Sequence, residues 1–184
     1  MTPEEIIQLK AFARIDGFLL SLLWVSSFVC YIVGISNPVW SLGAIVLALA
    51  SPIFVGKRLQ QFRDNAREGI ISFKRGWGYV TLVFFYAAVI LALVQYAYFT
   101  YLDNGYLFQA MNSMMDTAEG KQLIAQYNMG ETMTKAMDQF RSMRPIDMSL
   151  NVLTTNIMIG TILAVPIAAL LKSNVKRINK DIQS

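Results

Sequence analysis

One uncharged stretch of this sequence, from Trp77 to Leu102, restricts the fold more than any other feature. It contains no Asp, Glu, Lys or Arg, and its tyrosines carry no charge at neutral pH. As an α-helix that rises about 1.5 Å per residue, the stretch reaches roughly 39 Å, whereas the hydrocarbon core of a bilayer is about 30 Å thick. The stretch is therefore predicted to cross a membrane, with some tilt.

Three further apolar runs have the length of a membrane span. Together with the first they predict four crossings, at about 18–35, 39–56, 77–102 and 149–171. The composition agrees, because 55% hydrophobic residues and only 15% charged ones make this chain of 184 residues too apolar for an ordinary soluble domain. We therefore expect an all-α integral membrane four-helix bundle that forms one membrane domain over residues 1–184.

The first span, 18–35, has two interpretations, a cleaved signal peptide and a permanent anchor. Acidic residues precede it, no small-x-small cleavage site follows it, and the next apolar span begins almost at once. These features favour the uncleaved anchor. Between the two spans, Ser36-Asn37-Pro38 predicts a tight turn, because Pro38 disfavours a helical conformation at Asn37.

The segment 57–76, between the second and third spans, is polar and basic. Leu59, Phe62, Ala66 and Ile70 nevertheless keep helical spacing through it. This pattern fits either an extension of the second helix or a helix that lies on the membrane surface.

The distribution of basic residues predicts which side of the membrane each segment faces. Twelve of the 16 Lys and Arg lie on the side of the N-terminus, the 57–76 loop and the C-terminal tail, and the others lie in the long segment 103–148. Because cytoplasmic segments carry the excess of Lys and Arg, we expect both termini in the cytoplasm and 103–148 outside it. A nucleic-acid partner is not expected, since the cations flank apolar spans instead of forming one solvated face.

Some of these cations are candidates for contacts with anionic lipid headgroups. The favoured interpretation is that they serve only as topogenic charge with a general attraction to the membrane surface. The candidates are Lys57, Arg58, Arg63, Arg67, Lys74, Arg75, Lys172 and Lys176.

The segment 103–148 is the one substantial part of the chain that is predicted to lie outside the membrane on the side opposite the two termini. Asp103-Asn104-Gly105 predicts a turn at its start, and apolar residues then recur at helical intervals, with Gly120 and Gly130 as interruptions. We expect two or three short amphipathic helices here instead of a disordered loop.

Methionine is concentrated in this same segment, which holds eight of the 10 methionines in the chain. A flexible thioether surface suits an adaptable groove for another protein or for lipid. The favoured interpretation is nevertheless a small cap that packs its methionine face onto the membrane. A Cu(I) site is a further alternative, since Met111 and Met114 are spaced to place two sulfurs on one helix face. The candidate partner or lipid surface consists of Met111, Met114, Met115, Met133, Met137 and Phe140.

The types of residue present exclude several kinds of catalytic and metal site. The chain has no histidine, which excludes a His-containing triad and a His-ligated metal or haem, and its single cysteine, Cys30, lies inside an apolar run. No Walker-type loop, dinucleotide fingerprint or EF-hand pattern occurs. We expect no enzyme activity and no cofactor, and we interpret Asp16 beside Arg14 as an ion pair at headgroup level.

The four spans contain no Asp, Glu, Lys or Arg, which argues against an ion-coupled transporter. Their polar residues are expected to form hydrogen bonds between helices, worth about 0.6 kcal/mol each on average, and the alternative is a polar translocation path. The candidates are Gln95, Asn151 and Asn156, with Ser26, Ser27, Thr154 and Thr155.

One continuous run of the sequence is similar to a known family. A basic loop with Gly69 to Phe73 leads into the long apolar helix, which ends in the tyrosine-rich stretch Tyr96 to Tyr101 and a turn with Asp103. This run, and the layout of two close spans, a basic loop, a third span, a polar segment, a fourth span and a basic tail, resembles the domain-of-unknown-function family four-one-nine-nine. Its members are small four-span proteins of bacterial inner membranes with no established activity. The resemblance therefore implies a bacterial inner membrane and this four-span topology. It assigns no functional residue.

The missing reaction groups and the adaptable methionine surface favour a non-enzymatic accessory or scaffolding subunit. Its expected partners are the lipid bilayer and another membrane protein or a second copy of itself. The alternative is binding or passage of a lipid or small hydrophobic molecule by a homo-oligomer, since four helices alone enclose little space. An enzyme that acts on lipid comes third, and it would require carboxylates that converge at one membrane face.

Overall fold

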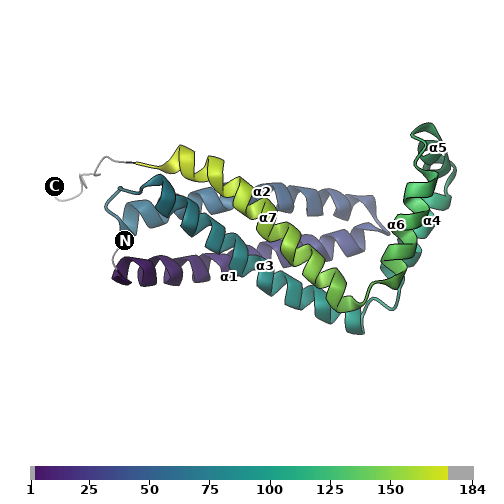
Figure 1. Ribbon diagram of the computed structural model, residues 1–184, viewed down its shortest axis with the longest axis horizontal. Coiled ribbons are helices and arrows are strands. Elements are labelled where there is room, and N and C mark those ends of the chain that lie inside the picture. The colour runs from purple at the N-terminus through teal and green to yellow at the C-terminus, as the bar shows by residue number, and fades with distance from the viewer. Residues whose placement is uncertain (1–2, 174–184) are drawn as a thin grey trace. The chain divides into compact units, whose positions relative to one another are not determined.

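The computed structural model describes residues 3–173, and the elements named in that range are all helices (Figure 1). They form two compact units. The first, here called the bundle unit, contains the described residues up to Ala92 and those from Val152, and the second, the methionine unit, runs from Leu93 to Asn151. In chain order the helices are α1 (Pro3–Gly34), α2 (Pro38–Ala66), α3 (Phe73–Tyr101), α4 (Tyr106–Asp116), α5 (Ala118–Gln126), α6 (Gly130–Ser142) and α7 (Pro145–Leu171).

Four of the helices, α1, α2, α3 and α7, are long and apolar enough to cross a membrane. They coincide with the four predicted spans, so the all-α architecture is confirmed and the chain is a multi-pass membrane protein. Both α1 and α2 are longer than their predicted spans. Residues 57–66 continue α2 as a regular helix, which is the first of the two alternatives for this segment. The grouping of the whole chain into one membrane domain stays a prediction.

The predicted turn between the first two spans is confirmed. Asn37 has the extended dihedral angles φ −144° and ψ 106°, and it is the N-cap of α2, with its side-chain oxygen accepting from the Val39 amide at 3.1 Å. Pro38 occupies the first helical position, where its missing N–H leaves no hydrogen bond unmade. The Ser41 hydroxyl donates to the Gly34 carbonyl at 3.0 Å and fastens the end of α1 to the start of α2.

The core of the bundle unit is built on α3. Figure 1 shows α1, α2 and the parts of α3 and α7 in this unit lying lengthwise side by side. Two adjacent residues in each turn of α3 are buried, which gives a broad apolar stripe with a spacing of four: Tyr79, Val80, Val83, Phe84, Ala87, Ala88, Leu91 and Ala92. A stripe this wide contacts more than one neighbouring helix, so α3 is the central helix of the bundle.

Two glycines allow close approach to α3. A Cβ atom at Gly17 of α1 would lie 2.6 Å from the Tyr86 Cβ, and one at Gly160 of α7 would lie 2.5 Å from the Phe84 Cβ. Both separations are far below van der Waals contact. Small residues of this kind let membrane helices pack at short range, where dispersion forces hold them together.

Side-chain hydrogen bonds connect α1 to α2 inside the apolar part of the bundle. The Trp24 indole donates to the Ser51 hydroxyl at 2.8 Å, and the Ser27 hydroxyl donates to the Ala44 carbonyl at 2.8 Å. The predicted interhelical role is thereby confirmed for Ser27. Ser26 instead donates to the Leu22 carbonyl of its own helix, at 2.9 Å.

The methionine unit contains three short helices, α4, α5 and α6, together with the adjoining ends of α3 and α7. The prediction of two or three short helices is confirmed. Asp103 begins the predicted turn, because its carboxylate accepts from the Gly105 and Leu107 amides at 3.1 Å each. Gly130 starts α6 as an interruption, whereas the prediction for Gly120 is wrong.

The break before α5 occurs at Thr117 instead. Its hydroxyl caps α5 by accepting from the Gly120 amide at 3.0 Å. Gly120 lies inside α5, where an added Cβ would meet the Met115 carbonyl oxygen at 3.0 Å. Glycine is used here for close packing of α5 against the end of α4, not to end a helix.

Candidate functional site

Three parts of the chain meet at one end of the bundle unit, which we call the basic end: the start of α1, the turn between α2 and α3, and the end of α7 (Figure 1). Backbone hydrogen bonds of 3.0 Å run both ways between Ile71, in the turn, and Ser173, after α7. Arg63 of α2 donates to the Leu171 carbonyl at 3.0 Å. This contact satisfies one of the carbonyls that the end of α7 leaves without a helical partner.

Glu5, in the first turn of α1, binds two arginines at the basic end. Its carboxylate accepts from Arg67 at 2.7 Å and from Arg75 at 2.6 Å, one on each oxygen. The three side chains are half-buried, between 15% and 28% exposed. Because Arg67 follows α2 and Arg75 lies on α3, this one carboxylate links three helices.

We expect that replacing Glu5 with Gln lowers the stability of the bundle, because the substitution leaves two half-buried guanidinium groups without their anion. The expected loss is about 1–2 kcal/mol, reduced from the value for a buried pair because solvent reaches all three groups. It should appear as a lower thermal midpoint in mild detergent. Glu4→Gln is the matched control and should melt like the wild type, since Glu4 is exposed. Equal midpoints for the two variants would contradict the role of Glu5.

A second ionic cluster is buried more deeply between α1, α2 and α3. Asp16 is only 2% exposed, and its carboxylate accepts from the Nε and Nη2 atoms of Arg58 on one oxygen and from the Tyr79 hydroxyl on the other. The ring of Phe62 stacks on the Tyr79 ring with centroids 4.7 Å apart and an interplanar angle of 8°. A carboxylate at this depth requires its ionic and hydrogen-bonding partners, so the cluster ties the three helices together.

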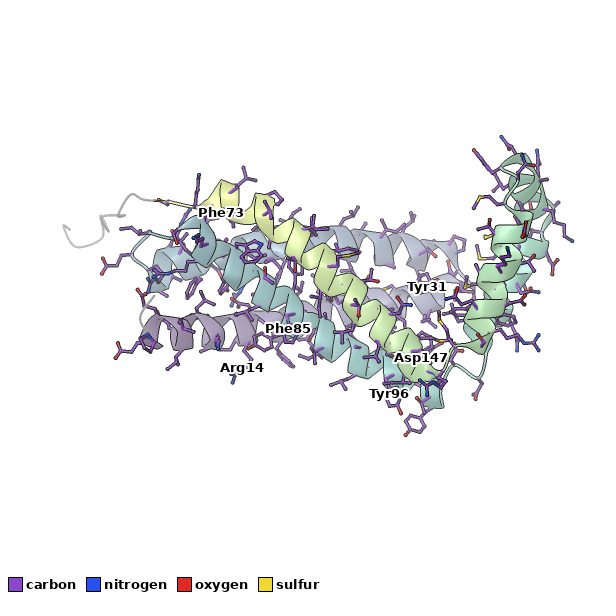
Figure 2. All side chains as sticks on the ribbon, in the orientation of Figure 1. Arg14, Tyr31, Phe73, Phe85, Tyr96 and Asp147 are labelled. Atoms are coloured by element: carbon purple, nitrogen blue, oxygen red, sulfur yellow. The ribbon has the colours of Figure 1, made fainter. Side chains whose placement is uncertain are left out.

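The interpretation of Asp16 and Arg14 as an ion pair at headgroup level is wrong. Arg14 is exposed, and Figure 2 shows it projecting away from the bundle. Successive residues two apart on a helix point in different directions, so Asp16 and Arg14 do not share a face. Spacing alone could have indicated burial, because Asp16 follows Leu9 and Ala13 and precedes Leu20 at intervals of three and four, and these residues form the buried face of α1.

The structure divides the predicted headgroup contacts into two groups. Arg58, Arg63, Arg67 and Arg75 are all engaged in hydrogen bonds or ion pairs within the chain, with side chains 12–29% exposed. Lys57, Lys74 and Lys172 are exposed. Lys176 lies outside the described residues. Contact of these residues with lipid headgroups stays a prediction.

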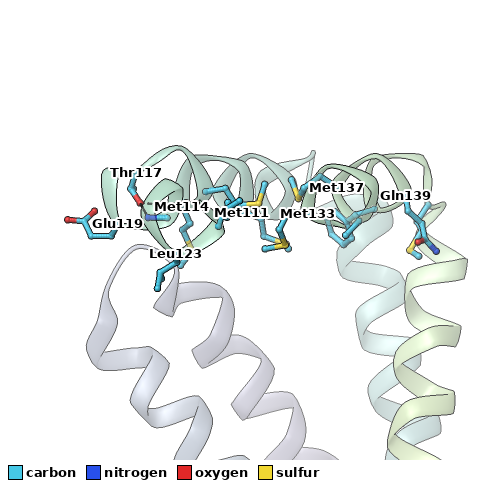
Figure 3. Close-up of a pocket in the computed structure, with 14 residues that line it drawn as sticks. Met111, Met114, Thr117, Glu119, Leu123, Met133, Met137 and Gln139 are labelled. Atoms are coloured by element: carbon cyan, nitrogen blue, oxygen red, sulfur yellow. Dashed lines mark hydrogen bonds between the residues drawn. The ribbon is translucent and has the colours of Figure 1, made fainter. Parts of the chain in front are cut away.

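The predicted methionine surface forms an apolar hollow, the methionine hollow, with a volume of about 700 Å³ (Figure 3). All six predicted residues line it, and Figure 3 shows Met111, Met133 and Met137 gathered between α4 and α6. The Phe108 and Phe140 rings stack with centroids 6.3 Å apart and so join α4 to α6. The remaining lining residues are Thr117, Glu119, Gly120, Leu123, Ile124, Ala136, Gln139 and Met143.

The exposure of the lining residues shows which of them a bound molecule could reach. Met137 is buried, at 8% exposed, and forms the floor of the hollow. Met114 and Leu123, which both line the hollow, are 66% and 55% exposed. An apolar contact that covers them would therefore release water and be favourable.

The predicted polar contacts between helices remain predictions for Gln95, Asn151 and Asn156. Gln95 is buried, and its Oε1 atom has no hydrogen-bond partner in the described part of the chain. Asn151 is exposed, and Asn156 is half-buried.

At the start of α7, Arg144 forms a forked ion pair with Asp147. Its Nε and Nη2 atoms donate to the two carboxylate oxygens at 2.8 and 2.9 Å. These hydrogen bonds, with the negative charge of Asp147, raise the pKa of Arg144 above its usual range. Asp147 lies in the first turn of α7, where a carboxylate also interacts favourably with the helix dipole.

The comparisons with known proteins place the chain in one family. A family model described as a protein of unknown function, DUF4199, matches residues 16–173. No curated protein and no solved structure matches the chain. The family match confirms the resemblance seen in the sequence, and its description names no activity.

Proposed function

Because the chain belongs to DUF4199, whose description names no function, we propose a role from its geometry: a non-enzymatic accessory subunit that binds an apolar helix of a second membrane protein in the methionine hollow. The observation that supports this role most is the hollow itself, with its volume of about 700 Å³ and its flexible thioether lining. Methionine side chains adapt to partners of different shape, and amphipathic helices bind other proteins by laying an apolar face into such a groove.

The placement of the hollow in the chain supports the same role. Its three helices lie between α3 and α7, two helices that cross the membrane, so the hollow is tethered close to a membrane surface. A partner that is itself a membrane protein is therefore held at the same depth. The proposed setting is a bacterial inner membrane, with the basic end in the cytoplasm and residues 103–148 outside it.

A photocrosslinking amino acid at Met114 tests the role directly in native membranes. We expect crosslinks to an apolar helix of one defined partner, and loss of most of them when Met111→Ala and Met133→Ala remove two walls of the hollow. The same crosslinker at Met158 of α7, 58% exposed and outside the hollow, is the matched control and should give lipid adducts only. Crosslinks from Met114 to lipid alone, with no protein adduct, would exclude a protein partner.

The second candidate function is binding of a lipid or small hydrophobic molecule by a homo-oligomer. The size of the hollow favours it, because about 700 Å³ falls within the range of roughly 300–1,000 Å³ that is usual for small-ligand pockets. Liposomes that contain only the purified protein distinguish the two candidate functions, because no second protein is present to fill the hollow. Saturable binding of a fluorescent fatty acid, abolished by Met137→Trp, would favour this second function.

A further inference from the structure

The arginines and lysines at the basic end differ in what they contact. Arg58, Arg63, Arg67 and Arg75 each donate to a carboxylate, and Arg63 donates in addition to the Leu171 carbonyl. Lys57, Lys74 and Lys172 are exposed and form no ion pair with any other described residue. These four arginines therefore hold the helices together, whereas the three lysines, like Lys10 and Arg14 of α1, are exposed to a partner outside the chain.

Each of the three lysines adjoins the end of an apolar span. Lys57 directly follows the apolar run 39–56 of α2, Lys74 lies in the first turn of α3, and Lys172 directly follows the last residue of α7. Each is thus at the boundary between an apolar crossing and the polar region beyond it. Lysines at such boundaries extend toward the membrane surface.

Contacts within the chain bring these lysines to the same end of the bundle. The paired hydrogen bonds between Ile71 and Ser173 hold Lys172, next to Ser173, close to the start of α3 that carries Lys74. The bond from Arg63 to Leu171 holds α2, which carries Lys57, against the end of α7. The three cations therefore come from three helices and lie at the same end of the bundle.

We propose that Lys57, Lys74 and Lys172 form a contact surface for the phosphate-containing headgroups of anionic phospholipids in the adjoining leaflet. A cation near an anionic membrane surface gains roughly 1 kcal/mol, and the contributions of three cations at the same end of the bundle add. The ammonium group suits this ligand, because it is a compact point charge with three donors on a flexible stem and does not require one geometry of phosphate. This surface belongs to the bundle unit and does not depend on the methionine hollow.

The test measures lipid affinity of the full-length protein in mild detergent by native mass spectrometry, with phosphatidylglycerol and phosphatidylcholine as the two probes. We expect the wild type to favour phosphatidylglycerol. The variant K57Q/K74Q/K172Q should bind it on the order of 100-fold more weakly, and each single variant roughly fivefold more weakly, with phosphatidylcholine binding unchanged. The variant K57R/K74R/K172R should bind like the wild type, because it keeps the three positive charges.

The matched control removes two lysines of the methionine unit, in the variant K121Q/K135Q. Both are exposed and pair with carboxylates of their own unit, Lys121 with Asp116 and Lys135 with Glu131. This variant should keep the preference for phosphatidylglycerol.

Equal phosphatidylglycerol affinity of the triple glutamine variant and the wild type would overturn the proposal. An equal loss in the control, or displacement of the lipid by excess inorganic phosphate, would also overturn it. If the triple glutamine variant does not fold, the phosphatidylglycerol affinities of the single glutamine variants test the proposal in the same way.

Discussion

Replacing Arg58 with Met is expected to destabilise the protein more than any other single change at the basic end. The substitution leaves the Asp16 carboxylate, 2% exposed, with the Tyr79 hydroxyl as its remaining partner among the contacts described above. Removing one member of a buried ion pair costs about 3–5 kcal/mol, because the other charge stays buried without compensation. Thermal unfolding in mild detergent should show a drop of many degrees, or the variant should fail to accumulate in membranes.

Two further variants separate the ion pair from other effects of the substitution. Arg14→Met removes an exposed arginine two residues from Asp16 and should leave the thermal midpoint unchanged. The triple variant Asp16→Leu, Arg58→Met and Tyr79→Phe removes the whole cluster and should recover most of the lost stability, since apolar replacement of a buried pair is often neutral. If Arg14→Met costs as much as Arg58→Met, the assignment of partners to Asp16 is incorrect.

Adding one methyl group at Gly160 is the second change with a large expected effect. The Cβ of Gly160→Ala would lie 2.5 Å from the Phe84 Cβ and 2.6 Å from its Cγ, both in the middle of the buried stripe of α3. Phe84 is 1% exposed and its ring stacks against that of Trp24, so we expect α7 to move away from α3. The expected cost is about 1–3 kcal/mol, as for other overpacked cores, measured again as the thermal midpoint in detergent.

Gly78 provides the matched control on α3 itself. An added Cβ at Gly78 would have no atom within 4 Å apart from the neighbouring backbone of α3 itself. Gly78→Ala should therefore be neutral or should stabilise the helix by up to about 1 kcal/mol, through the higher helix propensity of alanine. A loss at Gly78 as large as that at Gly160 would show that any change of glycine in these helices is harmful, and that close contact between α3 and α7 is not the cause.

The four membrane helices could be predicted from the sequence because their signal is local. A long apolar run must form its backbone hydrogen bonds within itself in a bilayer, and this makes it helical wherever it packs. The turn at Asn37 and Pro38 is equally local. The methionine surface was also predictable, since Met111, Met114 and Met115 repeat at helical spacing within α4, as do Met133 and Met137 within α6.

The contacts at the basic end depend on packing between distant parts of the chain. Asp16 is 42 positions from Arg58 and 63 positions from Tyr79, and no spacing rule connects residues so far apart. The same limit explains why Arg58, Arg67 and Arg75 are candidates for lipid contact in the sequence but pair with carboxylates of α1 in the fold. An arginine that contacts lipid and an arginine that pairs with a carboxylate have the same local sequence pattern. Only the position of α1 against α2 and α3 distinguishes them.

The break before α5 shows a smaller limit of the same kind. Glycine is the usual residue at which helices end, so Gly120 was the natural choice for an interruption. The helix instead restarts at Thr117, whose hydroxyl caps it, and the glycine serves contact with the Met115 carbonyl. Capping by threonine was visible in the sequence, but the close approach that requires a glycine was not.

Cysteine labelling measures whether the chain crosses the membrane four times with its basic end in the cytoplasm. In a Cys30→Ala background, Ser72→Cys places an exposed thiol in the turn between α2 and α3, and Ser113→Cys places one on α4. A membrane-impermeant thiol reagent added to bacterial spheroplasts should label Ser113→Cys and should reach Ser72→Cys only after the membrane is opened. Labelling of Ser72→Cys in sealed spheroplasts, or protection of Ser113→Cys, would contradict the proposed topology.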